Sequence, residues 1–169
     1  MHPLAQLEAA FGTRGAIVAG VLSGTSADGI DVALCRMRSS AGRLSRPELL
    51  GFETLEFEPD LARRVREVLD GAPCSLREAA LLARDLGRSF GRAAREFAAR
   101  AEVALDLVGS HGQTVYHHDG AEPSGPASLQ LGEGDHVAEE AGCASVSDFR
   151  QRDLSAGGRA RPCRRSPMG

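Results

Sequence analysis

The sequence predicts an α/β domain in which helices flank a mixed central sheet. Three early segments, at residues 16–22, 31–38 and 49–57, have the apolar character of strands. An amphipathic pattern from Ser75 to Ala101 then predicts one long helix. Further strands are predicted by the short apolar runs at residues 105–108, 128–131 and 143–146. With 169 residues, of which 42% are apolar, the chain can form one domain with a substantial core.

The first two strands are expected to form a hairpin around the segment LSGTSADGID, residues 22–31. Residues 1–14 precede this hairpin as an N-terminal extension with the apolar spacing of a short helix. Residues 39–47 form a polar connection to the third strand. The domain itself is expected to span residues 15–158, with an irregular tail at 159–169.

A first helix is predicted at residues 60–69, where the apolar side chains share one face and Gly71 is suited to end the helix. The basic side chains of this helix, Arg63, Arg64 and Arg66, are expected to be solvated.

The long helix is predicted to begin with a capping box made by Ser75 and Glu78. Its apolar stripe is assigned to the core. Gly87 and Gly91 inside the helix cost about 1 kcal/mol each relative to Ala, so we expect close packing on the sheet to require them.

The hairpin segment has the composition of a phosphate-binding loop. Gly24 and Gly29 allow backbone N–H groups to approach an anion, and Ser23, Thr25 and Ser26 add hydroxyl donors. The alternative is an ordinary polar turn, because neither the Walker pattern nor G-x-G-x-x-G is present.

Two carboxylates, Asp28 and Asp31, belong to the same segment. Because carboxylates beside phosphates repel them unless a divalent cation lies between, a nucleotide bound here implies Mg²⁺, held by these residues through water.

A second polar cluster, Ser110-His111-Gly112-Gln113-Thr114, follows the strand at residues 105–108. Ligands gather at the carboxyl ends of strands in α/β sheets, so this cluster is well placed for a binding site. The alternative for His111 is a purely structural histidine.

The segment at residues 117–126 is predicted to be a loop. Its tandem His117 and His118 beside Asp119 suggest a metal, but the ligand spacing and a fourth donor are missing.

The last predicted elements are a short acidic helix at residues 134–141 and the strand at 143–146. Beyond this strand lie Asp148, Arg150 and Asp153. Arginine is suited to bidentate capture of a carboxylate. The alternative is a surface ion-pair cluster, which is worth under about 1 kcal/mol.

Composition narrows the classes of partner. The net charge of -3 and the pI near 6.0 argue against nucleic acid and anionic membranes as partners. The four cysteines form no C-x-x-C pair, which argues against a zinc site and a disulfide framework. No apolar run is long enough to cross a bilayer and no secretory leader is recognisable, so a cytoplasmic protein is expected.

Three motifs occur in the order found in a known family. SGTSADGID at residues 23–31, GSHGQT at 109–114 and SDFRQRDLSAGG at 147–158 resemble the signatures of the anhydro-N-acetylmuramic acid kinases. These are sugar kinases of the actin, hexokinase and Hsp70 superfamily. The resemblance implies a ribonuclease H-like N-terminal kinase domain, to which the predicted order of strands and helices is similar.

The resemblance also implies a reaction and its ligands. Family members open the anhydro ring of 1,6-anhydro-N-acetylmuramic acid with water and transfer the γ-phosphate of ATP to give N-acetylmuramic acid 6-phosphate in cell-wall recycling. The implied ATP and Mg²⁺ site comprises Gly24, Thr25, Ser26, Ala27, Asp28, Gly29, Ile30 and Asp31. The residues implied to face the amino sugar are Ser110, His111, Asp148 and Arg150. A homodimer is compatible with the family.

The family's catalytic base is an aspartate in a G-F-D-x-G-P-G-N-like segment, which does not occur in these residues. Residues 159–169 (RARPCRRSPMG) contain four arginines in eleven residues, where the family continues with G-G-Q/R-G-A-P-L. We therefore hypothesise that residues from about Ala160 onward are out of frame and that the chain is a truncated, inactive kinase. The alternative is a native basic tail.

Two further functions stay open. The chain could be a non-catalytic module that binds nucleotide or phosphate. A metal hydrolase is the third hypothesis, and its ligands would be His111, His117, His118, Asp148 and Asp153.

Overall fold

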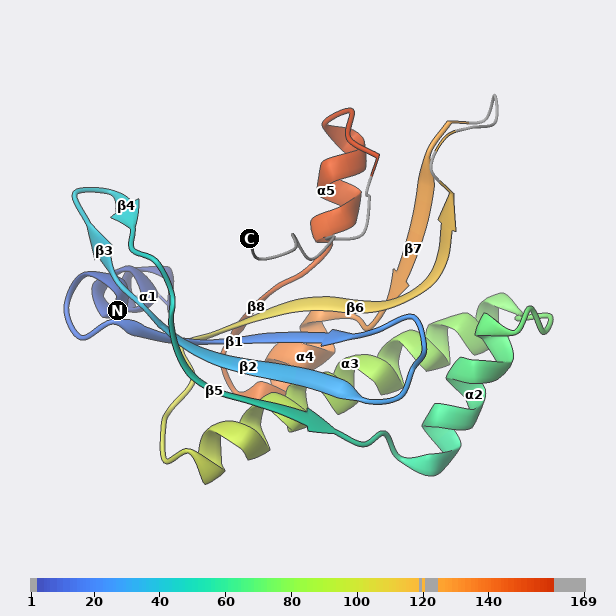
Figure 1. The fold of residues 1–169 in the computed structure, drawn as a ribbon, viewed down its shortest axis with the longest axis horizontal. Helices are drawn as coiled ribbons and strands as arrows, with labels where there is room; N and C mark the ends of the chain where they lie inside the picture. The colour runs from blue at the N-terminus through green and yellow to red at the C-terminus, as the bar shows by residue number, and fades with distance from the viewer. Residues whose placement is uncertain (1–2, 119, 121–124, 160–169) are drawn as a thin grey trace, which may run out of the picture.

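The computed structural model describes residues 3–118, 120 and 125–159, and Figure 1 shows their fold. The N-terminal half contains α1 (Pro3–Gly12), β1 (Ala16–Ser23), β2 (Ile30–Met37), β3 (Ser39–Ser40), β4 (Arg43–Leu44), β5 (Glu48–Leu55) and α2 (Pro59–Leu69). The C-terminal half contains α3 (Leu76–Arg100), β6 (Leu107–His118), β7 (Ala127–Leu131), α4 (Gly134–Ala141), β8 (Ala144–Val146) and α5 (Phe149–Ser155). The predictions made for Asp119 and for the tail from Ala160 lie outside the described residues.

The central sheet has the strand order β5-β2-β1-β6-β7, with β8 also paired to β6. Strand β1 is antiparallel to β2 and parallel to β6, and β8 is parallel to β6. This mixed sheet with flanking helices confirms the predicted fold class. Three parallel strands, β1, β6 and β8, therefore point toward the same edge of the sheet, which is the edge where α/β proteins place their ligands.

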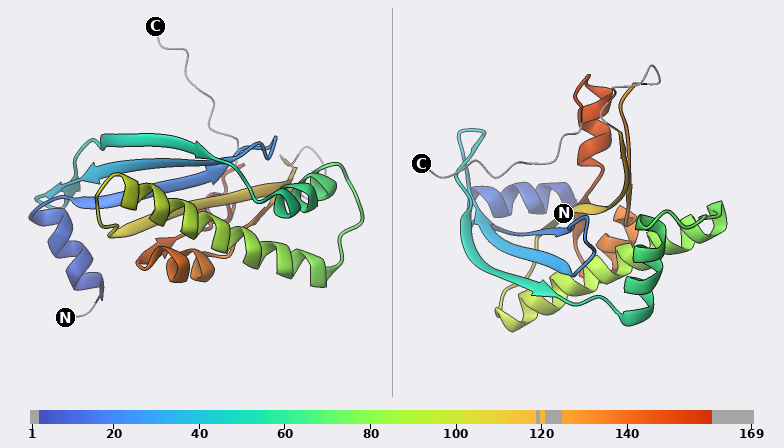
Figure 2. Two further views of the ribbon diagram at one scale, coloured as in Figure 1. Left: turned by 90° about the horizontal axis from the view of Figure 1, so that it is seen from below. Right: turned by 45° about the vertical axis from the view of Figure 1, so that its right-hand side comes forward.

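Helices α3 and α4 cover one face of the sheet, as Figure 2 shows. The predicted apolar stripe of α3 is core, since Leu82, Leu86 and Phe90 have no exposed surface. Burying a side chain of this size stabilises the fold by about 1.5–3 kcal/mol. The start of α3 is capped as predicted by Ser75, whose Oγ accepts from the N–H of Glu78 at 3.1 Å.

The two glycines of α3 are required by another helix, so the prediction of packing on the sheet is wrong. A Cβ atom on Gly87 would lie 2.5 Å from the carbonyl oxygen of Glu133, and one on Gly91 would lie 2.6 Å from that of Val137. Both carbonyls belong to α4 and its N-cap residue. The glycines therefore let two helix backbones approach closely.

Arg64 is not simply solvated, which corrects a second prediction. Its guanidinium contacts Asp85 at 2.8 Å and Glu78 at 3.3 Å, and its side chain is only 19% exposed. The Glu78 side chain contacts Arg64, so the described contacts confirm the Ser75 half of the predicted capping box and not the Glu78 half. The ion pairs join α2 to α3.

Strand β6 is longer than the predicted strand at residues 105–108. It runs from Leu107 to His118, so the polar cluster from Ser110 lies within the strand and not after it. His117 and His118 also belong to β6 and pair with β7, which corrects the predicted start of the loop. The polar residues are accommodated because the register with β1 shifts between Val21 and Ser23, and Gly112 has a φ of 74°.

Two smaller elements were not predicted. The polar connection at residues 39–47 contains the β3–β4 ribbon. Residues 149–155 form α5, for which no helix was expected. Among the residues that the structure describes, no helix has the length and apolar character needed to span a membrane.

Candidate functional site

The phosphate loop, residues 24–29, connects β1 to β2 at the carboxyl edge of the sheet (Figure 1). The last residue of β1, Ser23, is the register partner of Gln113 on β6. Strand β8 ends at Val146 on the other side of β6, and α5 begins three residues later. The topology therefore brings the three motifs of the sequence to one edge of the molecule.

The phosphate loop is a tight turn with an exposed tip. The Gly24 carbonyl accepts from the Ala27 N–H at 3.1 Å, and Ala27 has a φ of 51°. Residues Gly24, Thr25, Ser26 and Asp28 are exposed, whereas the side chains of Ala27 and Ile30 are buried in the core. Ala27 and Ile30 can therefore serve a ligand only through their backbone groups.

The two glycines of the loop have different physical roles. A Cβ atom on Gly29 would lie 2.8 Å from Thr54 Cγ2 and 2.9 Å from the Leu55 carbonyl, so packing against β5 requires glycine. A Cβ atom on Gly24 would meet only Ser26 Oγ, at 3.7 Å. Nothing in the fold requires glycine at position 24, which leaves close approach of a ligand as a reason for it.

The two acidic residues of this segment are also held differently. Asp28 is exposed, whereas Asp31 is half-buried and its Oδ1 accepts from Thr54 Oγ1 at 2.6 Å. Hard carboxylate oxygens suit Mg²⁺, so Asp28 and Asp31 fit a cation held through water beside bound phosphates. Within the described ranges no cluster of three or more metal-ligating side chains occurs, which leaves the metal-hydrolase hypothesis without structural support.

His111 and Arg150 form the second part of the site. Arg150 donates from Nε to His111 Nε2 at 2.9 Å, so Nε2 is the unprotonated nitrogen and Nδ1 can donate to the Gly112 carbonyl at 3.3 Å. Burial lowers the pKa of His111, and the charge of Arg150 lowers it further, against the opposing effect of the Gly112 carbonyl. The imidazole is therefore neutral at pH 7 and fixed in one tautomer.

The other two predicted sugar-facing residues, Ser110 and Asp148, differ in their exposure. Ser110 is 1% exposed, and its hydroxyl is buried without a hydrogen-bond partner in the described protein. Because side chains alternate along a strand, Ser110 and His111 point to opposite faces of β6. Asp148 is exposed at the start of α5, with a φ of 61°, and accepts from Ser147 Oγ at 3.1 Å.

Gln113 contacts the phosphate loop, although the sequence patterns assigned it no individual role. Its Nε2 donates to the Gly24 carbonyl at 3.0 Å, which links the GSHGQT motif directly to the phosphate loop. The available signal was its place between His111 and Thr114 in that motif. A contact between residues 89 positions apart cannot be read from local patterning.

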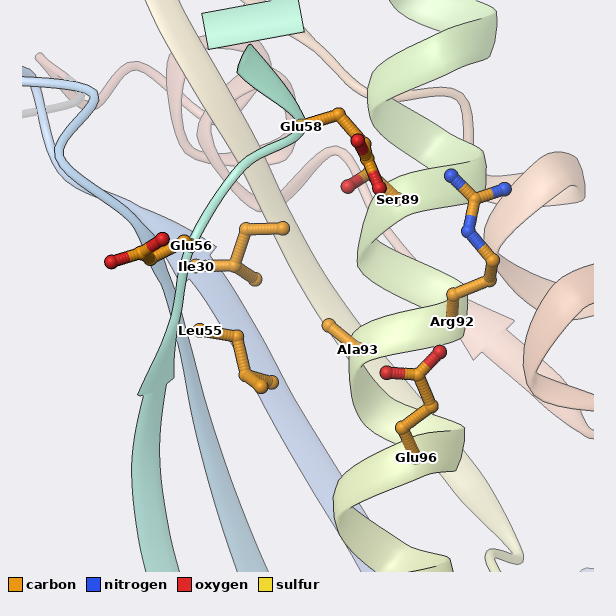
Figure 3. A pocket seen from close by; sticks show the side chains of 8 residues that line it. All are labelled: Ile30, Leu55, Glu56, Glu58, Ser89, Arg92, Ala93 and Glu96. Carbon is orange, nitrogen blue, oxygen red and sulfur yellow. The ribbon is translucent and has the colours of Figure 1, made fainter.

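A small hollow lies beside the phosphate loop, between the end of β5 and α3 (Figure 3). Its volume is about 100 Å³, well below the roughly 300 Å³ of a small ligand pocket. Arg92 at its rim pairs with Glu140 of α4 at 3.5 Å, and Glu56 points away from α3 in the figure. The hollow therefore supports no ligand site of its own.

Comparison with known proteins identifies what the chain is similar to. The model of a family described as anhydro-N-acetylmuramic acid kinase matches residues 16–165. A protein of that name from Synechococcus elongatus is 43% identical over 145 residues, which cover 86% of this chain and 38% of the relative. A protein of the same name from Bacillus cereus is 40% identical and covers 86% of this chain and 39% of the relative. One from Pseudoalteromonas atlantica is 33% identical and covers 88% of this chain and 39% of the relative. The chain thus spans about two fifths of the length of these curated relatives.

Proposed function

Because the chain belongs to the anhydro-N-acetylmuramic acid kinase family, we propose that it carries the nucleotide loop and part of the sugar site of such a kinase. The relatives are named as kinases, which are phosphotransferases. The proposed reaction of the whole protein is the ATP-dependent conversion of 1,6-anhydro-N-acetylmuramic acid to N-acetylmuramic acid 6-phosphate. The proposed compartment is the cytoplasm, where ATP is available.

The observation that carries the proposal is that Gln113 of β6 contacts the phosphate loop at Gly24, and that His111, two positions earlier on the same strand, pairs with Arg150. The exposed loop tip presents Thr25 and Ser26 as donors to the ATP phosphates. Asp28 and Asp31 would hold Mg²⁺ through water, and the cation would offset the charge of the phosphates. In this proposal the loop would position the nucleotide, and the cation held by Asp28 and Asp31 would offset its charge, which is what phosphoryl transfer requires of a protein.

The sugar is proposed to be bound by the positive charge of Arg150, with His111 fixing the orientation of the guanidinium. The guanidinium of Arg150 suits the lactyl carboxylate of a muramic acid, because arginine can bind a carboxylate with two parallel hydrogen bonds. His111 holds the Nε edge of Arg150, so it orients the guanidinium plane. Asp148 and Ser110 are proposed as further sugar contacts, and Ser110 would need its buried hydroxyl to become accessible.

Residues 1–169 are proposed to bind MgATP without turning over the sugar. Activation of the attacking water needs a base within hydrogen-bond reach, and the family's G-F-D-x-G-P-G-N-like segment does not occur in these residues. A titration of the purified chain with MgATP by calorimetry, followed by an assay for phosphorylated sugar, tests both parts. Binding without product is the expected result.

The alternative function is a fragment that binds phosphate or nucleotide without any sugar site. An NMR titration with anhydro-N-acetylmuramic acid separates the two functions. If anhydro-N-acetylmuramic acid shifts the NMR signals of His111 and Arg150, the sugar site is present. If MgATP binds but the sugar shifts neither signal, the alternative holds. Product formation at an ordinary kinase rate would contradict the proposed lack of turnover.

A further inference from the structure

We propose that Gln113 is a positioning residue that fixes the backbone orientation of the phosphate loop. This inference rests on the proposed function, because it concerns the loop assigned to the nucleotide. Gln113 is completely buried on β6, and its Nε2 donates to the Gly24 carbonyl at 3.0 Å and to the Thr114 carbonyl at 3.2 Å. Both N–H bonds of the amide are thereby used.

The hydrogen bond to Gly24 sets the direction of a peptide group. In a trans peptide the C=O and the following N–H point in opposite directions. Gln113 and the Ala27 N–H both hold the Gly24 carbonyl, so the N–H of Thr25 points away from them. Thr25 is an exposed residue of the loop, so an anion can approach this N–H.

Without Gln113, the turn hydrogen bond from the Ala27 N–H would be left to hold the Gly24 carbonyl, and the orientation would be less firmly fixed. The peptide between Gly24 and Thr25 could then rotate and present its oxygen to a phosphate. Carbonyl oxygen repels phosphate oxygen, whereas the N–H group binds it. Gln113 therefore acts on nucleotide binding through the loop and touches no ligand itself.

The environment of Gln113 Oε1 supports a role for this residue beyond packing. Gln113 Oε1 is buried without a hydrogen-bond partner among the residues that the structure describes. An unsatisfied buried acceptor destabilises a fold, and an apolar side chain of similar shape avoids that loss. The buried Oε1 of Gln113 thus lowers the stability of the fold, while its Nε2 orders the loop. Replacing Gln113 with an apolar residue should therefore raise or preserve global stability and reduce the order of the loop.

The test compares Gln113→Met with Gln130→Met in the full chain. Gln130 is a matched control, because its Nε2 donates within the β6–β7 hairpin, to Ser128 and Thr114. For Gln113→Met we expect an unchanged or higher melting temperature. We also expect hydrogen exchange of the Ala27 amide to rise about fivefold and MgATP affinity to fall by a similar factor. Gln130→Met should change neither loop exchange nor affinity.

Each outcome decides the proposal. Unchanged Ala27 exchange in Gln113→Met overturns it, as does an equal change in Gln130→Met. If the wild-type chain binds no MgATP, the proposed function fails. Hydrogen exchange of the Ala27 amide in the ligand-free protein still tests the role of Gln113 in that case. Should Gln113→Met fail to fold, the wild-type protein provides the test. An NMR contact between the Gln113 side-chain NH₂ and the α protons of Gly24 supports the proposal, and its absence overturns it.

Discussion

Arg150 on α5 donates its Nε–H to His111 on β6, 39 positions earlier in the chain. This hydrogen bond requires an imidazole whose Nε2 carries no proton. It also places a positive charge beside a half-buried histidine. The protonation state of His111 and the position of Arg150 are therefore coupled.

The first prediction is that Arg150→Gln raises the pKa of His111. Removal of the neighbouring positive charge makes the imidazolium less unfavourable, while the burial that lowers the pKa remains. The pKa is measured by NMR titration of the imidazole protons. Arg152→Gln, a change at an exposed position of the same helix, is the control and should leave the pKa unchanged. An unchanged pKa in Arg150→Gln would contradict the coupling.

The second prediction concerns stability at mildly acidic pH. The folded pKa of His111 lies below the ordinary value of 6.5, so the unfolded chain binds the proton more readily. The stability that His111 contributes is complete above pH 6.5 and falls as the pH drops toward the folded pKa. Urea unfolding between pH 5 and pH 7.5 should show a smaller loss of stability for His111→Gln than for wild type. Parallel curves would count against this assignment.

The third prediction reverses a common rule for helices. Gly→Ala in a helix usually stabilises by about 1 kcal/mol. In Gly87→Ala and Gly91→Ala the new methyl group would press on α4 and destabilise the fold by roughly 1–3 kcal/mol. Gly12→Ala in α1 is the matched control, because a Cβ atom added there would meet no neighbour within 4 Å. Denaturant unfolding of the three variants checks the sign.

The fourth prediction is that Gly24→Val or Asp28→Ala abolishes measurable MgATP binding. The valine would occupy the surface that phosphates approach, and the alanine would remove a water-mediated contact to the cation. Since a Cβ atom fits at position 24, Gly24→Val should keep the wild-type melting temperature. Asp70→Ala, which removes another exposed carboxylate, is the control. Unchanged calorimetric binding in both loop variants would mean that the loop is only a turn.

The fifth prediction concerns the ion pairs between α2 and α3. Arg64→Met should destabilise the fold by about 1 kcal/mol, more than Arg63→Met, whose exposed partners lie on its own helix. Burial alone would raise the pKa of Asp85, but its hydrogen bonds to Arg64 and Arg84 lower the pKa overall. The contribution of Asp85 is therefore present above its unfolded pKa and lost as the pH falls through its folded pKa. Arg64→Met should make acid unfolding less steep in that range.

The sequence predicts those elements whose signals are local. Strand β1 is a continuous apolar run, and α3 combines a regular stripe with the Ser75 cap, so both follow from patterning alone. The length of β6 does not, because its polar residues from Ser110 onward resemble a loop. Helix α5 is also missed, because its residues are mostly polar and the preceding Asp148 has a left-handed backbone in place of an ordinary cap.

The candidate site shows the same division. The composition of the loop at residues 24–29 is visible in the sequence, and so are the residue types of the GSHGQT motif at residues 109–114. Their pairings are not visible, because the contact of Gln113 with Gly24 and that of Arg150 with His111 depend on how β6 is placed between β1 and β8. The packing partner of Gly87 is hidden for the same reason.

The pairing of β1 with β6 also determines when the site can form during synthesis. The two strands pair through residues as far apart as Val18 and Leu107, 89 positions along the chain. A ribosome makes the β1–β2 hairpin long before it makes β6, and contacts over such separations form late because loop closure must come first. A nascent chain from which β6 has not yet emerged therefore carries the complete segment of residues 24–29 without the strand that pairs beside it. Stalled chains long enough for β6 to have left the ribosome should be retained on an ATP matrix, whereas chains whose β6 is still enclosed by the ribosome should not.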